Sequence, residues 1–265
     1  MIQYILMKIS VIIPAFNEEK QLGACLQSII DQEEKADEII VVDNNSSDHT
    51  AEIAQNYGVG VIKEYKQGMI YARNCGFNEA KYEIIARTDA DTYVPKDWIR
   101  RIKVHFKEDK KLVGLSGAAY FRDIPSLAQI SQWPTRVFFV PFRRIIGHDC
   151  LYGPNMVIRK SAWEKIKNDV CLNEHQVHED MDLAVHIGEF GHVKFDSKLV
   201  VSTSFRRWKK LSPYFEYSYR NMWTIQRHKE VIRQRGKRFV ERVLSKRSNL
   251  QATLMNKLQG KPVKV

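Results

Sequence analysis

Residues 8–91 alternate between short apolar runs and amphipathic stretches. Runs rich in apolar and β-branched residues, typical of buried strands, lie at residues 8–14, 37–43, 59–65 and 82–91. Between them, at residues 18–32, 47–58 and 68–80, apolar side chains recur at helical spacing. Strands that alternate with helices of this length predict βαβ units and a mainly parallel sheet, that is, an α/β fold with helices flanking the sheet.

Polar clusters follow three of the predicted strands, at residues 14–19, 43–48 and 88–92. Because ligands of parallel α/β sheets bind beyond the carboxyl ends of the strands, we expect the three clusters to converge on one crevice. Asp89 and Asp91 stand one residue apart in the last cluster. Mg²⁺ and Mn²⁺ prefer carboxylate oxygens as ligands and often bridge them to a diphosphate, so the pair could hold such an ion. Alternatively, the two aspartates could cap the turn or helix that follows.

Composition separates a nearly neutral body from a basic end. The chain has 265 residues, 44% of them hydrophobic, which suffices for one large α/β domain or two closely packed halves. Residues 206–247 hold 14 Lys and Arg against three Asp and Glu. Such a segment can meet nucleic acid, anionic lipid or a phosphorylated substrate. Composition alone does not choose among them.

The sequence lacks motifs that several classes of protein require. No GxGxxG follows the first strand and no GxxxxGK[ST] occurs, which disfavours a dehydrogenase or a P-loop ATPase. The four cysteines are far apart, so we expect a reducing, cytoplasmic setting without a disulfide framework. The opening residues 1–7 are too short for a signal peptide, and the apolar stretch 133–147 is interrupted by Pro and Arg, so no membrane span is predicted.

Six motifs in register carry a resemblance to a known family. They read "ISVIIPAFNEE", "EIIVVDNNSSDHT", "GMIYARNCG", "TDADT", "YGPNMVIRKSAWEKI" and "HEDMDLAVHIGEFGHVKFD", in this order along the chain. The sequence resembles an inverting nucleotide-sugar glycosyltransferase of family 2 with the GT-A fold, from residue 8 to about residue 208. The resemblance implies a domain over 1–205, with a nucleotide-binding half at 8–113 and an acceptor half at 114–205, and a basic, mostly helical extension at 206–265.

The resemblance implies a donor site at the strand ends. Its nucleotide-binding residues would be Pro14, Ala15, Asn17, Glu18, Asp43, Asn44, Arg73 and Asp89. Asp91, with Asp89, would bind a divalent cation, Mn²⁺ or Mg²⁺. Many enzymes that use UDP-sugars have a second aspartate where this chain has Asn44, so the resemblance does not identify the base of the nucleotide. Arg73 would approach the diphosphate or the base, or else pair with Glu79 or a neighbouring acidic loop.

The second half would supply the base and the acceptor site. The resemblance implies that Asp180 takes the proton of the acceptor hydroxyl, with Glu179 positioning the acceptor or acting as the base itself. The alternative is that these acids only cap a helix and favour its dipole. Sugar or acceptor contacts would come from Gly153, Asn155, Arg207 and Trp208. Asn155 could equally satisfy a buried loop.

Two further features leave alternatives open. Cys171, His175 and His178 have spacings that are not usual for a zinc site, and the histidines would more often face solvent or the acceptor. The basic, aromatic C-terminal segment is expected to contact an anionic membrane surface, or else to present a solvated face of a packing helix.

The sequence therefore predicts an inverting enzyme that moves one sugar from a nucleoside-diphosphate sugar to a hydroxyl of a glycan or lipid-linked acceptor. This chemistry would serve glycan, glycolipid or cell-envelope polysaccharide synthesis in the cytoplasm, or at the cytoplasmic face of the membrane, with no nucleic acid as partner. A nucleotidylyltransferase is disfavoured because residues 14–23 lack its Gly-rich, Arg-containing loop. The remaining alternative is a non-catalytic protein that binds nucleotide, sugar or nucleic acid.

Overall fold

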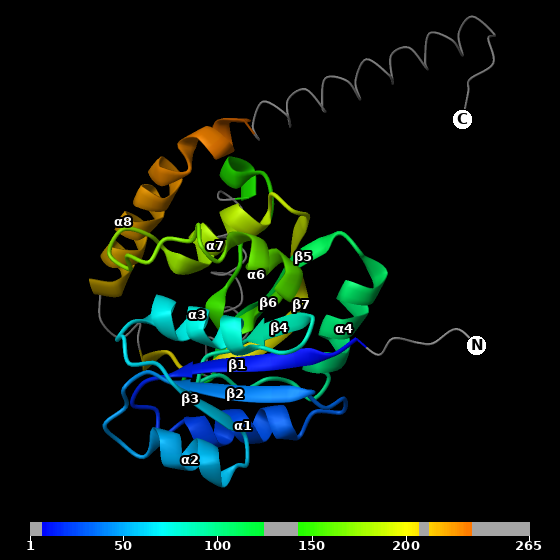
Figure 1. Ribbon diagram of the computed structural model, residues 1–265, viewed down its shortest axis with the longest axis vertical. Coiled ribbons are helices and arrows are strands. Elements are labelled where there is room, and N and C mark those ends of the chain that lie inside the picture. The colour runs from blue at the N-terminus through cyan, green and yellow to red at the C-terminus, as the bar shows by residue number, and fades with distance from the viewer. Residues whose placement is uncertain (1–6, 125–142, 207–211, 235–265) are drawn as a thin grey trace, which may run out of the picture.

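A seven-stranded sheet forms the centre of the protein in the computed structural model, which describes residues 7–124, 143–206 and 212–234 (Figure 1). The strands are β1 (Ile9–Ala15), β2 (Glu38–Asp43), β3 (Gly60–Lys63), β4 (Ile84–Arg87), β5 (Leu112–Phe121), β6 (Met156–Arg159) and β7 (His192–Thr203). The helices are α1 (Leu22–Ile30), α2 (Thr50–Asn56), α3 (Met69–Glu79), α4 (Trp98–Glu108), the short 3₁₀ helix η2 (Gly153–Asn155), α6 (Lys160–Ile166), α7 (Glu179–Ile187) and α8 (Ser212–Arg227).

The strand order is β3-β2-β1-β4-β6-β5-β7. β1 pairs in parallel with β2 and β4, β2 with β3, and β5 with β7, whereas β6 runs antiparallel to both of its neighbours. The predicted alternation over residues 8–91 is confirmed, as is the mainly parallel sheet flanked by helices. One continuous sheet therefore includes strands from both parts of the predicted domain.

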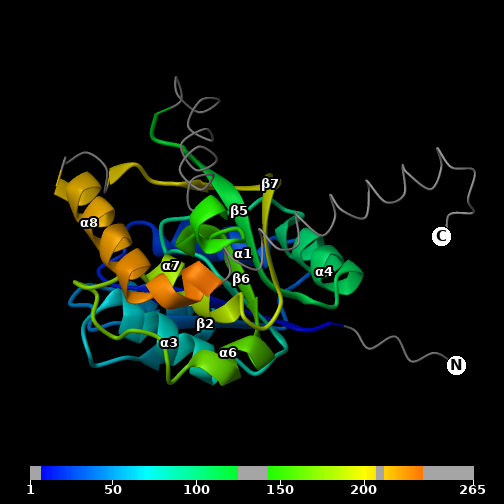
Figure 2. The same ribbon diagram turned by 90° about the horizontal axis from the view of Figure 1, so that it is seen from above.

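Helices cover both faces of the sheet, and the side chains of β1 alternate between two cores (Figures 1 and 2). Val11 and Ile13 belong to a core that α1 and α4 complete, with Trp98 fully buried in it. Ile12 points into the other core, shared with α3, α6 and α7, where Trp163 is fully buried. A strand covered on both faces has no polar alternation, which explains the continuous apolar run at the start of the chain.

The loop before α3 is capped from a distant part of the chain. Gly68 has a φ of +144°, and a Cβ there would lie 2.7 Å from Glu174 Oε1. The same Glu174 oxygen accepts the Ile70 N–H at 2.7 Å, so it satisfies a backbone donor in the first turn of α3 that has no local cap. Glycine at position 68 thus makes room for the carboxylate that joins α3 to the segment before α7.

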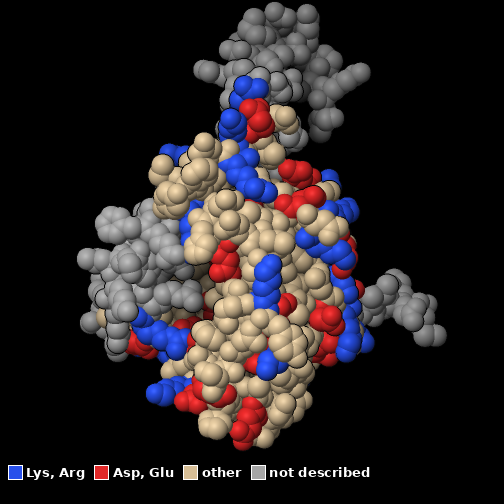
Figure 3. Space-filling view, turned by 60° about the vertical axis from the view of Figure 1, so that its left-hand side comes forward, with Lys and Arg blue, Asp and Glu red and all other residues tan. Residues whose placement is uncertain are grey.

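Basic and acidic side chains are interspersed over the described surface seen in Figure 3. Much of the predicted basic extension lies outside the described residues, as do Arg207, Trp208 and most of the apolar stretch 133–147. Among the helices of the described residues, none combines the length and the apolar character needed to cross a bilayer.

Candidate active site

The ends of β1 and β2 are tied together by the polar residues that follow them. Asn17, at a φ of +54°, donates its N–H to Ser46 Oγ at 3.0 Å and accepts the Ser47 N–H at 2.8 Å. Asp43, 3% exposed, accepts the Ser46 N–H at 3.1 Å. The predicted convergence of the first two polar clusters at one sheet edge is therefore present in the structure.

Asn44 uses its side chain to hold the loop before α3. Its Nδ2 donates to the carbonyls of Glu64 and Lys66 at 2.9 and 2.8 Å, and its Oδ1 accepts the Gly68 N–H at 2.8 Å. A carboxylate could not donate the first two bonds. The departure from aspartate at this position thus has a structural reason, and the side chain, 3% exposed, is committed to the protein.

Three carboxylates gather where the first and third clusters meet. Arg206, just after β7, pairs with Glu18 and lies 3.3 Å from Asp91 Oδ2 through its Nε. Burial, with the nearby charges of Asp91 and Asp89, raises the pKa of Glu18 in spite of Arg206. Glu18 Oε2 is buried without a hydrogen-bond partner among the described residues. Carboxylate oxygens of this kind are the ligands that Mn²⁺ and Mg²⁺ prefer.

A buried arginine joins this cluster to the predicted base. Arg87, 2% exposed at the end of β4, contacts Asp89 Oδ1 at 3.2 Å through Nη2. Its Nη1 contacts Glu179 Oε1 at 2.9 Å and Asp180 Oδ1 at 3.3 Å. One guanidinium therefore joins Asp89 to the two acids that open α7. Sequence reasoning missed Arg87, although an arginine at the end of an apolar strand needs acidic partners.

Glu179 and Asp180 differ in their expected ionisation. Burial and the Glu179 charge raise the pKa of Asp180 to about 7. Burial by itself would raise the pKa of Glu179, but the charges of Arg87 and Arg73 together lower it. Two neighbouring carboxyls with pKa values pushed apart are typical of acid–base sites. Glu179 can thus stay charged, while Asp180 can gain and lose a proton near neutral pH.

Gly153 fits closely against this pair. Its N–H donates to Asp180 Oδ2 at 2.8 Å, and a Cβ would lie 3.0 Å from Arg87 Nη2 and 3.2 Å from Asp180 Oδ2. Gly153 is therefore packed against the Arg87–Asp180 pair, and its expected sugar or acceptor contact stays a prediction.

Two predicted ligand-binding side chains are used inside the protein. Asn155, 0% exposed, donates to the carbonyls of Ala118 and Leu199 at 3.1 and 2.9 Å and accepts from Trp98 Nε1 at 2.9 Å. The Asn155 amide therefore makes the structural bonds that the alternative expected, while its sugar contact stays a prediction. Arg73, 1% exposed, lies 3.5 Å from Glu179 Oε2 and donates to the Glu179 carbonyl, so its acidic partner is Glu179 and not Glu79.

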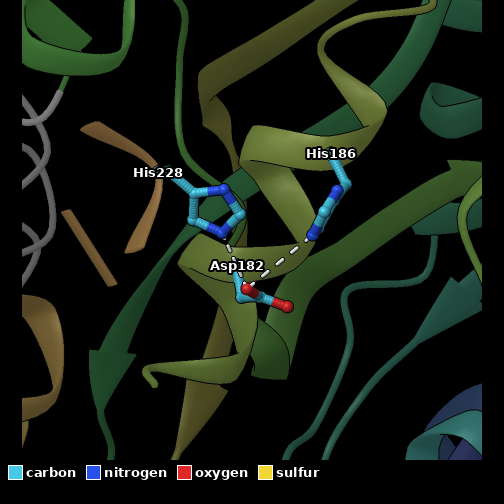
Figure 4. A group of neighbouring side chains, drawn as sticks. All are labelled: Asp182, His186 and His228. Atoms are coloured by element: carbon cyan, nitrogen blue, oxygen red, sulfur yellow. Dashed lines mark hydrogen bonds and ion pairs between the residues drawn. The ribbon is translucent and has the colours of Figure 1, made fainter. Parts of the chain in front are cut away.

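The Cys171, His175 and His178 grouping does not form a cluster in the structure. Asp182, His186 and His228 come together instead, at one face of α7 (Figure 4). The sequence offered only the i, i+4 spacing of Asp182 and His186 as a signal, since His228 is distant in the chain.

Comparison with known proteins identifies the family. The family model described as "Glycosyl transferase family 2" matches residues 10–167, more than half of the chain. The chain belongs to glycosyl transferase family 2. This family 2 chain is 34% identical over 101 residues to glycosyltransferase AglE of Haloferax volcanii, a match that covers 35% of this chain and 33% of the relative.

A second curated relative is the undecaprenyl-phosphate 4-deoxy-4-formamido-L-arabinose transferase of Proteus mirabilis. It is 33% identical over 117 residues, with 40% of this chain and 36% of the relative covered. The family 2 chain thus spans about a third of the length of these relatives.

Solved structures share the fold. The mannosyltransferase PcManGT of Pyrobaculum calidifontis has a TM-score of 0.65 at 17% identity, covering 86% of this chain and 69% of its own. TarS of S. aureus has a TM-score of 0.59 at 20% identity, covering 75% and 60%. The family 2 chain accordingly has the GT-A fold, as the sequence predicted.

Proposed function

We propose that this enzyme transfers a single sugar, with inversion, from a nucleoside-diphosphate sugar to a hydroxyl of an acceptor. The observation that carries the proposal is the buried Arg87, which contacts Asp89 on one side and the Glu179–Asp180 pair on the other. A group that binds the leaving diphosphate and a group that takes the acceptor proton must stand on opposite sides of the reacting carbon in a single displacement. Through Arg87, Asp89 on the donor side and Asp180 on the acceptor side are held in fixed positions relative to each other.

Asp180 is the proposed base. A carboxyl whose pKa lies at about 7 is half ionised at neutral pH and accepts a proton more readily than an ordinary aspartate. Gly153 N–H fixes one of its oxygens, which leaves the orientation of the other to Arg87. Glu179 remains charged between Arg87 and Arg73 and orients both guanidinium groups.

Glu18, Asp89 and Asp91 are the proposed holders of a divalent cation, which when bound would neutralise the diphosphate as it leaves. The donor nucleotide would lie along residues 14–18, Asp43 and the end of β4. Two of the solved structures with this fold contain such ligands: PcManGT is in complex with GDP-Man and Mn²⁺, and one TarS structure is in complex with UDP-GlcNAc.

The proposed acceptor is a glycan or a lipid-linked saccharide of cell-envelope synthesis. Support comes from the names of two curated relatives, the undecaprenyl-phosphate transferase above and a poly-beta-1,6-N-acetyl-D-glucosamine synthase of Staphylococcus epidermidis.

The donor site is tested by calorimetric titration of UDP, GDP, ADP and dTDP with and without Mn²⁺. We expect one nucleotide to bind in a Mn²⁺-dependent way, and Asp91→Asn to abolish the Mn²⁺-dependent part, because the variant removes one cation-binding charge. Asp31→Asn, at an exposed position after α1, is the control and should bind as the parent does. Mn²⁺-dependent binding that survives in Asp91→Asn would exclude the assigned cation site, and no binding of any nucleotide would contradict the proposed donor.

The pH dependence of transfer should follow Asp180. Because the pKa is raised to about 7, the carboxyl is protonated and inactive as a base at lower pH. We therefore expect kcat/KM to rise as the pH increases through about 7 and to level off above it. The measurement is kcat/KM between about pH 5.5 and 8.5 at saturating cation. A profile that stays flat across this range would contradict the assignment.

A further inference from the structure

We propose that Asp182, His186 and His228 form a binding site for a divalent transition-metal ion, with Zn²⁺ as the best-fitting ion. The site is separate from the Asp89–Asp91 pair and lies outside the chemistry proposed above. It would fasten the chain that follows α8 to α7 (Figure 4).

The ligand atoms already surround one point. The three groups each offer an atom within 4.8 Å of the others. Asp182 Oδ1 lies 2.8 Å from His228 Nε2 and 3.9 Å from His186 Nε2. Ligands of a tetrahedral zinc ion stand about 3.3 Å apart, given metal–ligand distances near 2.0–2.1 Å. The two measured separations lie on either side of that value, so small side-chain shifts would admit the ion.

The surroundings orient the ligands toward one another. Asp182 and His186 share a face of α7 because they are four residues apart. The other Asp182 oxygen, Oδ2, accepts the Cys171 N–H at 2.9 Å, which directs Oδ1 to the histidines. The His186 and His228 rings stand 4.9 Å apart and nearly perpendicular, at 86°. Outer contacts that fix a ligating carboxylate in this way are a regular part of metal sites.

An unsatisfied nitrogen points to a missing ligand. His186 Nε2 is buried and has no hydrogen-bond partner among the described residues. Asp182 is 1% exposed and His228 6% exposed, so water has limited access to the cluster. Buried polar atoms are nearly always bonded, and each exception needs an explanation. A bound cation would accept the free electron pair of the His186 nitrogen.

The donor set selects the class of metal. Two imidazoles and one carboxylate suit Zn²⁺ and other borderline first-row ions, whereas Mg²⁺ and Ca²⁺ prefer an all-oxygen set. With three protein ligands, a fourth position is available to a water molecule. The site thus differs in chemistry from the all-carboxylate cluster of Glu18, Asp89 and Asp91.

The position suggests what the ion would do. α7 begins with Glu179 and Asp180, and Asp182 and His186 lie further along the same helix. His228 directly follows α8, next to an apolar cluster in which Val231 and Ile232 pack beside Val185. A bound ion would therefore hold the chain at the end of α8 against the helix that carries the proposed base.

The test is equilibrium dialysis of the full chain against Zn²⁺, with metal analysis of the retained protein. Asp91→Asn removes a ligand from the other proposed cation site, and this variant should still retain one zinc ion per chain. His186→Gln and His228→Gln should each weaken zinc binding by at least about tenfold, the loss that even changes outside the ligand shell cause. His175→Gln, an exposed histidine in the segment before α7, is the matched control and should bind as the parent does.

Two further readouts do not depend on activity. Co²⁺ in place of Zn²⁺ should give the visible absorption of a four-coordinate ion, and this signal should be lost in His186→Gln. Zinc should raise the Tm of the parent by several degrees but leave that of His186→Gln unchanged, since an ion stabilises only a fold that binds it.

The proposal is overturned if Asp91→Asn retains no zinc, or if His186→Gln binds zinc as tightly as the parent. His186 is 19% exposed in its side chain, so this variant is expected to fold even if His228→Gln does not. Mn²⁺-dependent nucleotide binding should persist in His186→Gln, which separates this site from the donor site.

Discussion

Asp180→Asn should reduce sugar transfer by about 10²- to 10⁴-fold, the usual contribution of a general base. The asparagine has nearly the same shape, and its amide oxygen can still accept the Gly153 N–H, but it cannot take up a proton at neutral pH. Donor affinity should stay close to that of the parent, because Asp180 lies on the acceptor side of Arg87 in the proposed mechanism. The measurement is release of nucleoside diphosphate from the donor that calorimetry selects.

Asp169→Asn, at an exposed position between α6 and α7, is the matched control and should retain full turnover. Turnover of Asp180→Asn within a few-fold of the parent would remove Asp180 from the mechanism. A parallel loss of donor affinity would instead assign the residue to donor binding. The two measurements together therefore separate catalysis from binding.

Arg87→Met should lower the free energy of unfolding by about 3–5 kcal/mol at pH 7.5. The variant removes the cation shared by Asp89, Glu179 and Asp180 and leaves their charges buried without it. Urea unfolding, followed by circular dichroism, measures the loss. Arg101→Met, on α4, breaks a partly exposed pair with Asp97 and a hydrogen bond to the Lys198 carbonyl, and should cost no more than about 1 kcal/mol.

The loss in free energy of unfolding caused by Arg87→Met should be smaller at lower pH. In the parent, the lowered pKa of Glu179 contributes stability above its unfolded-state pKa, and this is lost as the pH falls through the folded-state value. Without Arg87, burial raises the pKa values of these carboxyls, so they take up protons in the folded state and the repulsion disappears. Equal deficits at about pH 7.5 and 5 would show that the lost stability is packing and not charge.

The sequence predicted that the polar clusters meet at the strand ends, because their positions depend on local patterns. Strand runs, helical spacing and polar clusters at strand ends are all short-range signals, and parallel topology brings them together. Asp89 and Asp91 were found in this way. The position of Glu18 beside them follows from the same rule, since both clusters come directly after strands.

Long-range partners could not be predicted in the same way. Arg87 meets Glu179 and Asp180, which are about 90 residues away in the chain. His228 meets Asp182 only because α8 packs on α7. The amide of Asn155 was open between a sugar contact and structural bonding, and no structural role was predicted for Asn44, because such bonds depend on partners that only the three-dimensional structure shows. Neither periodicity nor spacing encodes such contacts.

The proposed active site is complete only after the antiparallel strand β6 has joined the sheet, so its formation depends on the order in which the chain folds. Strands β3, β2, β1 and β4 are contiguous in sequence, and β4 is the outer member of that group until β6 pairs with it, Arg87 opposite Met156. Closing that loop of about 70 residues costs chain entropy, which local contacts do not offset. We therefore expect a nascent chain to present Arg87 on an open strand edge. The guanidinium becomes enclosed only after residues 156–180 have been synthesised and have joined the sheet.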